Sequence, residues 1–281
     1  MGLLDRLRGT GSPPAEAQST AVETAEQSAT RLLEEGMALE EEARLDEALQ
    51  RYDAAIQLTP ELARAHFNRG NILLDRGDAA HALAAYTQAV AYKPDSAAAH
   101  YNIGNAHLHL GHPEAAVVAY NKALELKPEF ADAHVALGSA QETQGQLEAA
   151  AASYRRALAI RPDSAEVHYK LASILKRLGR MDEAVENYGR VLELEPEYVD
   201  AHSQLGFVLH DLGRLDEAAR SYRRALEIKP DSVEVHGNLG NVLKELRQYE
   251  GAIASYRRVL EIQPDSAEAY NNIGNALKDL G

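Results

Sequence analysis

The sequence predicts an all-α fold, a right-handed superhelical solenoid of antiparallel helix pairs, because several residues recur every 34 positions along the 281-residue chain. The tyrosine series comprises Tyr52, Tyr86, Tyr120, Tyr154, Tyr188, Tyr222 and Tyr256. An alanine stands four residues before each of these tyrosines, and a proline stands eight residues after it. A glycine series of the same period comprises Gly36, Gly70, Gly104, Gly138, Gly206, Gly240 and Gly274, with Ala172 in the missing place.

The period divides the chain into a leader and a repeat array. We expect residues 1–28 to be a disordered leader, because residues 9–28 are rich in Gly, Ser, Pro, Ala, Thr and Glu. Residues 29–281 are expected to form the array. Its units start at residues 29, 63, 97, 131, 165, 199 and 233, and a half unit starts at residue 267.

Each unit is expected to contain a helix, a tight turn, a second helix and a short loop. In the unit 97–130, the first stripe at helical spacing comprises His100, Ile103, Gly104 and His107. The second stripe comprises Ala116, Tyr120, Ala123, Leu124 and Leu126. Gly111 lies between the stripes, where a left-handed residue would end the first helix. Pro128 ends the second helix, and serines such as Ser164 are expected to cap the helix that follows.

Composition excludes several classes of function. The net charge of −14 argues against nucleic acid as a partner, because phosphate binding needs a dominant basic face. The absence of cysteine excludes disulfides, thiolate zinc sites and thiol nucleophiles. No apolar stretch approaches the length of a membrane span, so we expect a cytoplasmic protein. We expect no metal, no cofactor and no enzymatic activity, since the carboxylates are scattered and the glycines do not form a phosphate-binding loop.

The order Gly104, Gly111, Ala116, Tyr120 and Pro128 within a 34-residue unit resembles the tetratricopeptide repeat. The array is also similar to the repeat regions of O-linked N-acetylglucosamine transferase-like proteins. The resemblance implies that extended peptides or helices bind in a concave groove lined by the first helices. It implies that repeat positions 2, 5, 6, 9, 12 and 13 line this groove. A clamp for a partner's C-terminal carboxylate is not expected, because no lysine stands at position 5.

Asparagine rows at repeat positions 6 and 9 are the first candidate peptide-binding site. They comprise Asn68, Asn71, Asn102, Asn105, Asn238, Asn241, Asn272 and Asn275. A side-chain amide donates and accepts hydrogen bonds, so such rows could hold a peptide backbone of any sequence. The position-6 row is interrupted by Glu34, Ala136, Lys170 and Gln204. The alternative is that asparagine is simply common at these positions.

A local basic patch in the fifth unit is the second candidate. It comprises Tyr169, Lys170, Lys176 and Arg177, with Arg180 just beyond. Such a patch could receive an acidic side chain or terminus of a peptide. The alternative, which we favour, is an ordinary solvated surface.

Six histidines share repeat position 4, namely His66, His100, His134, His168, His202 and His236. Each lies a whole repeat from the next, too far apart to ligate one metal ion. We therefore expect them to pack or hydrogen-bond between helices. Partly buried imidazoles also predict lower stability near pH 5 than at pH 7.5.

The sequence therefore predicts a non-catalytic scaffold that binds protein segments. One alternative is the substrate-recognition module of a larger or separately encoded glycosyltransferase. Another is a purely structural assembly element. The last helix repeats the interior pattern at Tyr270, Ile273, Ala276 and Leu277, so we also expect end-to-end self-association through it.

Overall fold

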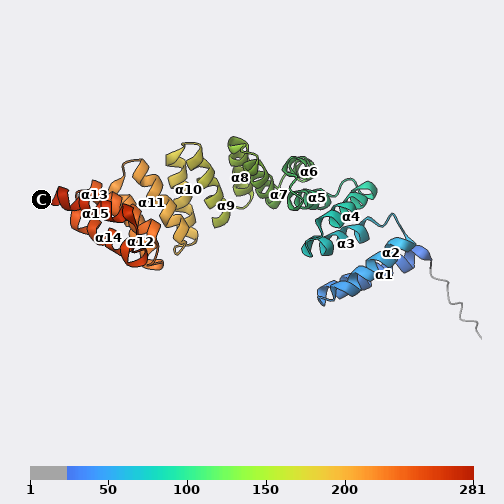
Figure 1. The fold of residues 1–281 in the computed structure, drawn as a ribbon. Coiled ribbons are helices and arrows are strands. Elements are labelled where there is room, and N and C mark those ends of the chain that lie inside the picture. Colours follow the sequence, from blue (N-terminus) through green and yellow to red (C-terminus); the bar gives the residue numbers. More distant parts are fainter. Residues whose placement is uncertain (1–23) are drawn as a thin grey trace, which may run out of the picture.

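The computed structural model describes residues 24–281, and within this range every regular element is an α-helix (Figure 1). The first helices of the successive units are α1 Ala25–Glu41, α3 Ala63–Asp75, α5 Ala97–His109, α7 Ala131–Thr143, α9 Ala165–Arg177, α11 Val199–Asp211, α13 Val233–Glu245 and α15 Ala267–Leu280. The second helices are α2 Leu45–Leu58, α4 Ala79–Tyr92, α6 Pro113–Leu126, α8 Leu147–Ile160, α10 Met181–Leu194, α12 Leu215–Ile228 and α14 Tyr249–Ile262. The fold is the all-α solenoid that the sequence predicts.

The first helix starts shortly before the first unit. Helix α1 begins at Ala25. Thr24 caps the helix, since its hydroxyl accepts a hydrogen bond from the Gln27 amide while the Gln27 side chain accepts one from the Thr24 amide. Residues 1–23 of the predicted leader lie outside the described residues.

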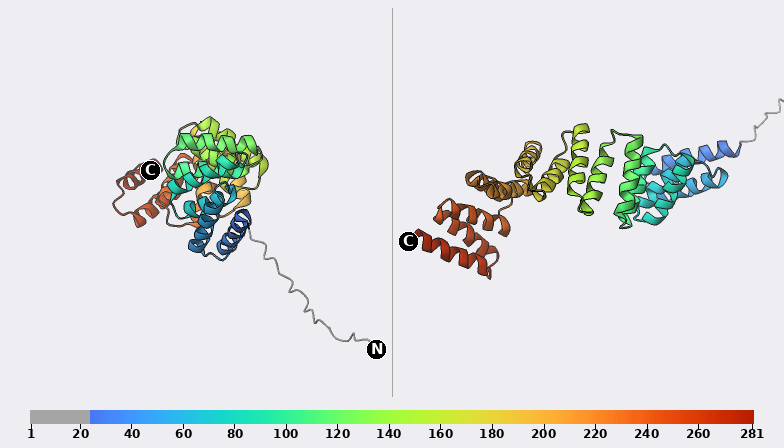
Figure 2. Two further views of the ribbon diagram at one scale, coloured as in Figure 1. Left: turned by 90° about the vertical axis from the view of Figure 1, so that its right-hand side faces the viewer. Right: turned by 90° about the horizontal axis from the view of Figure 1, so that it is seen from above.

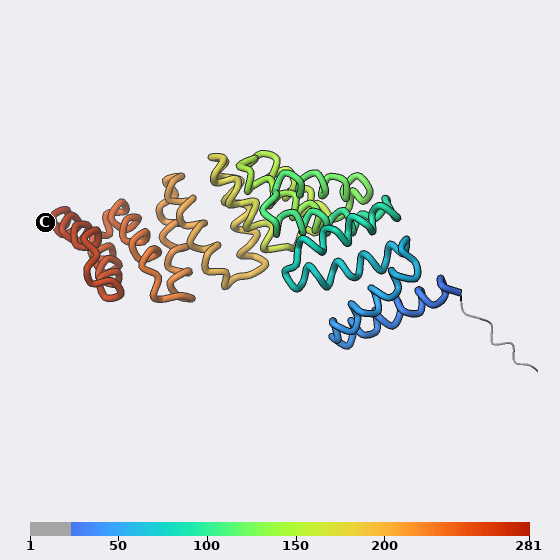
Figure 3. Tube along the Cα trace, turned by 45° about the vertical axis from the view of Figure 1, so that its right-hand side comes forward, coloured from blue at the N-terminus to red at the C-terminus, as the bar shows by residue number. Residues whose placement is uncertain are grey.

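The helix pairs stack into an elongated, curved array whose two ends lie far apart (Figure 1). Views from the end and from above show that successive pairs turn about the long axis (Figure 2), and the Cα trace follows the same turn (Figure 3). Within residues 24–281, several pairs of successive first helices, such as α1 with α3 and α3 with α5, are in closer contact than any pair of successive second helices. Equivalent elements approach most closely on the inner side of a curved stack. The first helices therefore line the concave side.

The tyrosine series forms the centre of each unit's core. All seven rings are buried, with exposed fractions of 0–1%. At every glycine of the 34-residue series from Gly36 to Gly240, an added Cβ would lie closer than 3.0 Å to the ring of the tyrosine sixteen residues later. The small residue therefore lets the two helices of a unit cross with the aromatic ring between them.

The first helix of most units ends at a left-handed residue. Gly77, Gly111, Gly145, Gly179 and Gly213 have φ between 72° and 79°. Ala43 and Arg247 occupy the equivalent places in the first and seventh units, and their φ values are 58° and 59°. These two units therefore hold a side chain in a conformation that favours glycine. The predicted caps also form, since the hydroxyls of Ser164 and Ser232 each accept a hydrogen bond from a backbone amide three residues later.

The six position-4 histidines tie the first helix of a unit to the loop before it. In each case Nε2 lies 2.8–3.0 Å from the carbonyl oxygen of the proline six residues earlier. A carbonyl oxygen only accepts, so Nε2 carries the proton. The histidines therefore form hydrogen bonds as expected, although these bonds join a helix to the preceding loop rather than to another helix. No cluster of potential metal ligands occurs among residues 24–281.

Candidate functional site

The tyrosine hydroxyls connect the buried core with the concave side. In the second to fifth units and in the seventh, the hydroxyl reaches the first helix of its own unit at repeat position 9, where the partner is Asn71, Asn105, Ser139, Ser173 or Asn241. In the first unit, the Tyr52 hydroxyl instead donates to Glu40 at repeat position 12, at 2.6 Å. The O···O distances to the three asparagines are 2.9, 2.7 and 2.7 Å. Burial raises the pKa of these tyrosines, for example that of Tyr154 and Tyr256 to about 12, so the hydroxyl is protonated at neutral pH. It donates to Oδ1 and thereby fixes the orientation of each asparagine amide.

The sixth unit also departs from this arrangement. Its position 9 is Phe207, which cannot accept a hydrogen bond and is 40% exposed. The Tyr222 hydroxyl is buried and finds no hydrogen-bond partner among residues 24–281. The hydroxyl row is therefore interrupted between the asparagines of the third unit and those of the seventh.

The asparagines of the second and third units form a connected chain. Asn102 Nδ2 donates to Asn71 Oδ1 at 2.9 Å, across the boundary between α3 and α5. Asn105 Nδ2 donates to Asn102 Oδ1 at 3.4 Å. Asn68 lies one turn earlier on α3 and donates to the Tyr52 hydroxyl of the preceding unit at 3.4 Å. The structure thus connects Asn71, Asn102 and Asn105 on neighbouring first helices, whereas Asn68 bonds to the preceding unit instead.

These bonds leave part of each amide unused. The Asn71 oxygen accepts two hydrogen bonds, from Tyr86 and from Asn102, whereas none of the hydrogen bonds above uses an Asn71 N–H. An amide carries two N–H donors, so Asn71 keeps donor capacity on the half-buried concave side. Asn71 can therefore donate to a carbonyl oxygen of a peptide backbone.

Three of the C-terminal asparagines line a cavity. Asn238, Asn241 and Asn272 share the wall of a hollow of about 330 Å³ between α13, α14 and α15. Asn275 lies one turn further along α15, where it is exposed and outside this wall. The fourth predicted residue of this group is therefore separate from the other three.

The predicted basic patch is not a single surface. Lys170 pairs with Glu166 of its own helix at 3.5 Å, and Arg177 Nη1 reaches Glu142 of α7 at 2.7 Å. Lys176 donates to Gln204 of α11 and lies over the ring of Phe207, 5.1 Å from its centroid. The cations are thus engaged with neighbouring repeats rather than gathered around one position.

Tyr169 belongs to the packing between the fifth and sixth units. Its ring stacks on that of Tyr198 with centroids 5.2 Å apart and meets the edge of the Tyr188 ring at 5.7 Å. Burial raises the pKa of Tyr169 to about 12. Tyr169 therefore stabilises the packing of the groove wall through its ring contacts.

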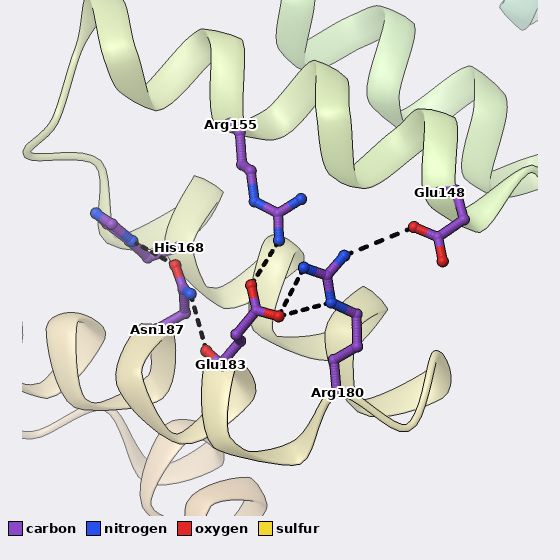
Figure 4. Close-up of polar contacts among 6 residues, drawn as sticks. All are labelled: Glu148, Arg155, His168, Arg180, Glu183 and Asn187. Atoms are coloured by element: carbon purple, nitrogen blue, oxygen red, sulfur yellow. Dashed lines mark hydrogen bonds and ion pairs between the residues drawn. The ribbon is translucent and has the colours of Figure 1, made fainter.

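Arg180 points into a separate ion-pair network (Figure 4). Its guanidinium lies 2.6 Å from Glu183 and 3.7 Å from Glu148, and Glu183 also pairs with Arg155 at 2.8 Å. The hydrogen bond from Arg180 is the main cause that lowers the pKa of Glu183. This network joins the second helices α8 and α10, which lie opposite the concave side.

Sequence reasoning missed the residues that open the C-terminal cavity. Gly237 at position 5 and Ser266 at position 34 lie in its wall, together with Glu234 and Glu268. The small residue at position 5 was visible in the sequence, because the second, third and fifth units carry Phe67, Tyr101 and Tyr169 there. The contrast between glycine and these aromatic residues at position 5 could have indicated a cavity in the seventh unit.

Comparison with protein families gives matches along most of the chain. A family described as TPR repeat matches residues 41–77, 143–179 and 240–281. Two families described as tetratricopeptide repeat match residues 67–128 and 169–233, and residues 221–254. A comparison with curated proteins finds no match. Within the described residues, no helix has the length and apolar character needed to cross a membrane.

Several solved structures are similar to this chain. YrrB, described as a TPR protein with an unusual peptide-binding site, is 25% identical; the match covers 66% of this chain and 96% of YrrB, with a TM-score of 0.61. MamA is also 25% identical, with 59% of this chain and 97% of MamA covered and a TM-score of 0.56. The C-terminal part of a TPR repeat-containing protein from Cytophaga hutchinsonii is 15% identical but has a TM-score of 0.73 over 86% of this chain and 99% of its own. The last of these likenesses concerns the fold alone.

Proposed function

The chain belongs to the tetratricopeptide repeat family, and we propose that it is a protein-interaction scaffold that holds extended segments of partner proteins in its concave groove. The peptide-binding site named for YrrB, a protein of similar structure, supports this proposal. The alternative of a recognition module for a glycosyltransferase stays a prediction.

One observation carries the proposal. The asparagine oxygens at position 9 are occupied by buried tyrosine hydroxyls, so their N–H groups are oriented by the core. Donors held in place by the fold lose little conformational freedom when a ligand binds. Such donors on the neighbouring helices α3 and α5, and again on α13, are suited to bind the carbonyl oxygens of an extended peptide.

The test uses fluorescently labelled, fully degenerate octapeptides with acetylated N-termini and amidated C-termini, titrated with the whole protein. The variant replaces the position-9 asparagines, Asn71, Asn105 and Asn241, with alanine. We expect its apparent Kd to rise about tenfold or more, since each lost hydrogen bond weakens binding by roughly 0.5–1.5 kcal/mol. The matched control replaces Gln57, Gln88 and Asn121 with alanine, all exposed residues of second helices.

The control is expected to bind as the unaltered protein does. Equal binding by the asparagine variant and the control would contradict the proposal. Circular dichroism and thermal unfolding of both variants separate a loss of binding from a loss of the fold.

A further inference from the structure

The cavity between α13, α14 and α15 exists because two side chains are missing from it. In the third and fifth units, an aromatic residue at position 5 packs on another at the end of the unit. The ring centroids are 5.0 Å apart for Tyr101 and Phe130 and 5.2 Å apart for Tyr169 and Tyr198. The seventh unit has Gly237 and Ser266 at these positions. The hollow therefore occupies the place that an aromatic pair fills elsewhere in the array.

The space is open at Gly237 itself. A Cβ added at this residue would meet no atom within 4 Å, whereas one added at Gly240, on the next turn, would clash with the Tyr256 ring. Gly237 therefore does not serve close helix packing. Glycine in the middle of a helix also destabilises it by roughly 0.5–1 kcal/mol relative to alanine. Neither packing nor helix propensity accounts for a glycine here.

The wall of this cavity, which we call the Gly237 pocket, is negatively charged. Glu234 in the first turn of α13 and Glu268 in the first turn of α15 both line it, together with Asn238, Asn241 and Asn272. Among the described residues that line it, none is lysine, arginine or histidine. The wall also contains apolar surface from Val259 and Ala269.

These features define the chemistry of an occupant. An apolar stem would pack against Val259 and Ala269, as long cationic side chains bury their methylene groups. A cation at its end would meet the carboxylates of Glu234 and Glu268, and charge-assisted hydrogen bonds of this kind are about twice as strong as neutral ones. An acidic side chain would instead face two like charges. The position of Tyr256 is consistent with this field, since Glu268 adds to the effect of burial that raises its pKa to about 12.

We propose that the Gly237 pocket receives one lysine or arginine side chain of the segment bound in the groove. The pocket thus makes the seventh unit the specificity-determining part of the array. This inference rests on the proposed function, because the side chain arrives as part of a peptide on the concave side.

The test compares four sets of the capped octapeptides, each degenerate except for a fixed central Lys, Arg, Leu or Glu. With the unaltered protein, we expect the Lys and Arg sets to bind about tenfold more tightly than the Glu set, and more tightly than the Leu set. A factor of ten is the size expected for one charge-assisted contact. Gly237→Tyr fills the pocket without a clash at Cβ, and Glu234→Gln with Glu268→Gln removes its charge.

Both pocket variants are expected to lose the preference for Lys and Arg while they still bind the Leu set. The matched control, Glu129→Gln with Glu186→Gln, changes the net charge equally at exposed residues of other units and should keep the preference. A preference that survives in both pocket variants, or that disappears equally in the control, would overturn the pocket but leave the scaffold proposal standing. Failure of the unaltered protein to bind any set would overturn both.

Discussion

At Gly138, the absence of a Cβ atom allows the two helices of the unit to pack closely. A Cβ at this position would lie 2.8 Å from Cε1 of Tyr154, whereas a Cβ at Gly274 would meet no atom within 4 Å. The close helix crossing was predictable from the glycine and tyrosine periods. The hydrogen bonds of the tyrosine hydroxyls were not, because their partners vary between asparagine and serine and depend on where the ring points.

We therefore predict opposite effects for two identical substitutions. Gly138→Ala should lower the free energy of unfolding by about 1–2 kcal/mol, because overpacking outweighs the gain in helix propensity. Gly274→Ala should leave it unchanged or raise it by up to roughly 1 kcal/mol. Urea unfolding monitored by circular dichroism measures both. Equal effects of the two substitutions would show that the tyrosine contact does not set the glycine requirement.

His107 in α5 gives the expected acid sensitivity a specific origin. Burial lowers its pKa, nearby His112 adds a smaller effect, and its Nδ1 has no partner among residues 24–281. A histidine with a lowered pKa binds fewer protons in the folded than in the unfolded state. Its contribution to stability is present above about pH 6.5 and is lost as the pH falls below that value.

The prediction is a lower Tm at pH 5 than at pH 7.5, with a smaller difference for His107→Gln. A pH 5 endpoint stays above the range in which ion-paired carboxylates such as Glu183 begin to take up protons. An unchanged Tm in the unaltered protein would refute the prediction.

At the scale of elements, the helix boundaries follow from the residues that end helices. Glycine between the two stripes and proline after the second stripe predict a helix pair in every unit, and the structure contains these pairs. The hydrogen-bond partners of the basic residues on α9 were not predictable, because they are distant in sequence. Arg177 bonds to a residue 35 positions away, and Lys176 bonds to one 28 positions away. Which side chains meet across repeats depends on the rotation between units, and no local pattern encodes it.

The ends of α1 and α13 are expected to be weak points of the array. Ala43 and Arg247 hold positive φ values where five other units have glycine. Left-handed conformation costs a non-glycine residue roughly 1–2 kcal/mol, offset in part by the greater freedom of glycine in the unfolded chain. Ala43→Gly and Arg247→Gly should each raise the free energy of unfolding by about 0.5–1 kcal/mol. Gly145→Ala is the matched reverse change, and it should lower that free energy by a similar amount.

At the scale of the whole molecule, the array leaves the outer face of α15 exposed. Tyr270 and Leu277 are 60% and 48% exposed, although they continue the apolar pattern of the inner repeats. We predict association through this face, seen as a scattering mass that rises with protein concentration. Tyr270→Glu with Leu277→Glu should abolish the rise. A monomeric mass at high concentration would exclude the association.

The solenoid itself was predictable from the 34-residue period, whereas the position of the pocket proposed to select Lys or Arg was not. The Gly237 pocket results from residues on three helices that meet only after the units stack. Its function nevertheless depends on the same feature as the rest of the groove, namely side chains on first helices that the core holds in position.

The most direct test of the account is to observe the asparagine side chains while a peptide binds. Nitrogen-15 NMR resolves side-chain amide signals, and the capped octapeptides with fixed central Lys serve as the probe. We predict that the signals of Asn71, Asn102, Asn238 and Asn272 shift on addition of the peptides, whereas that of Asn121 on the second helix α6 does not. Shifts confined to second helices, with the concave asparagines unmoved, would contradict the account.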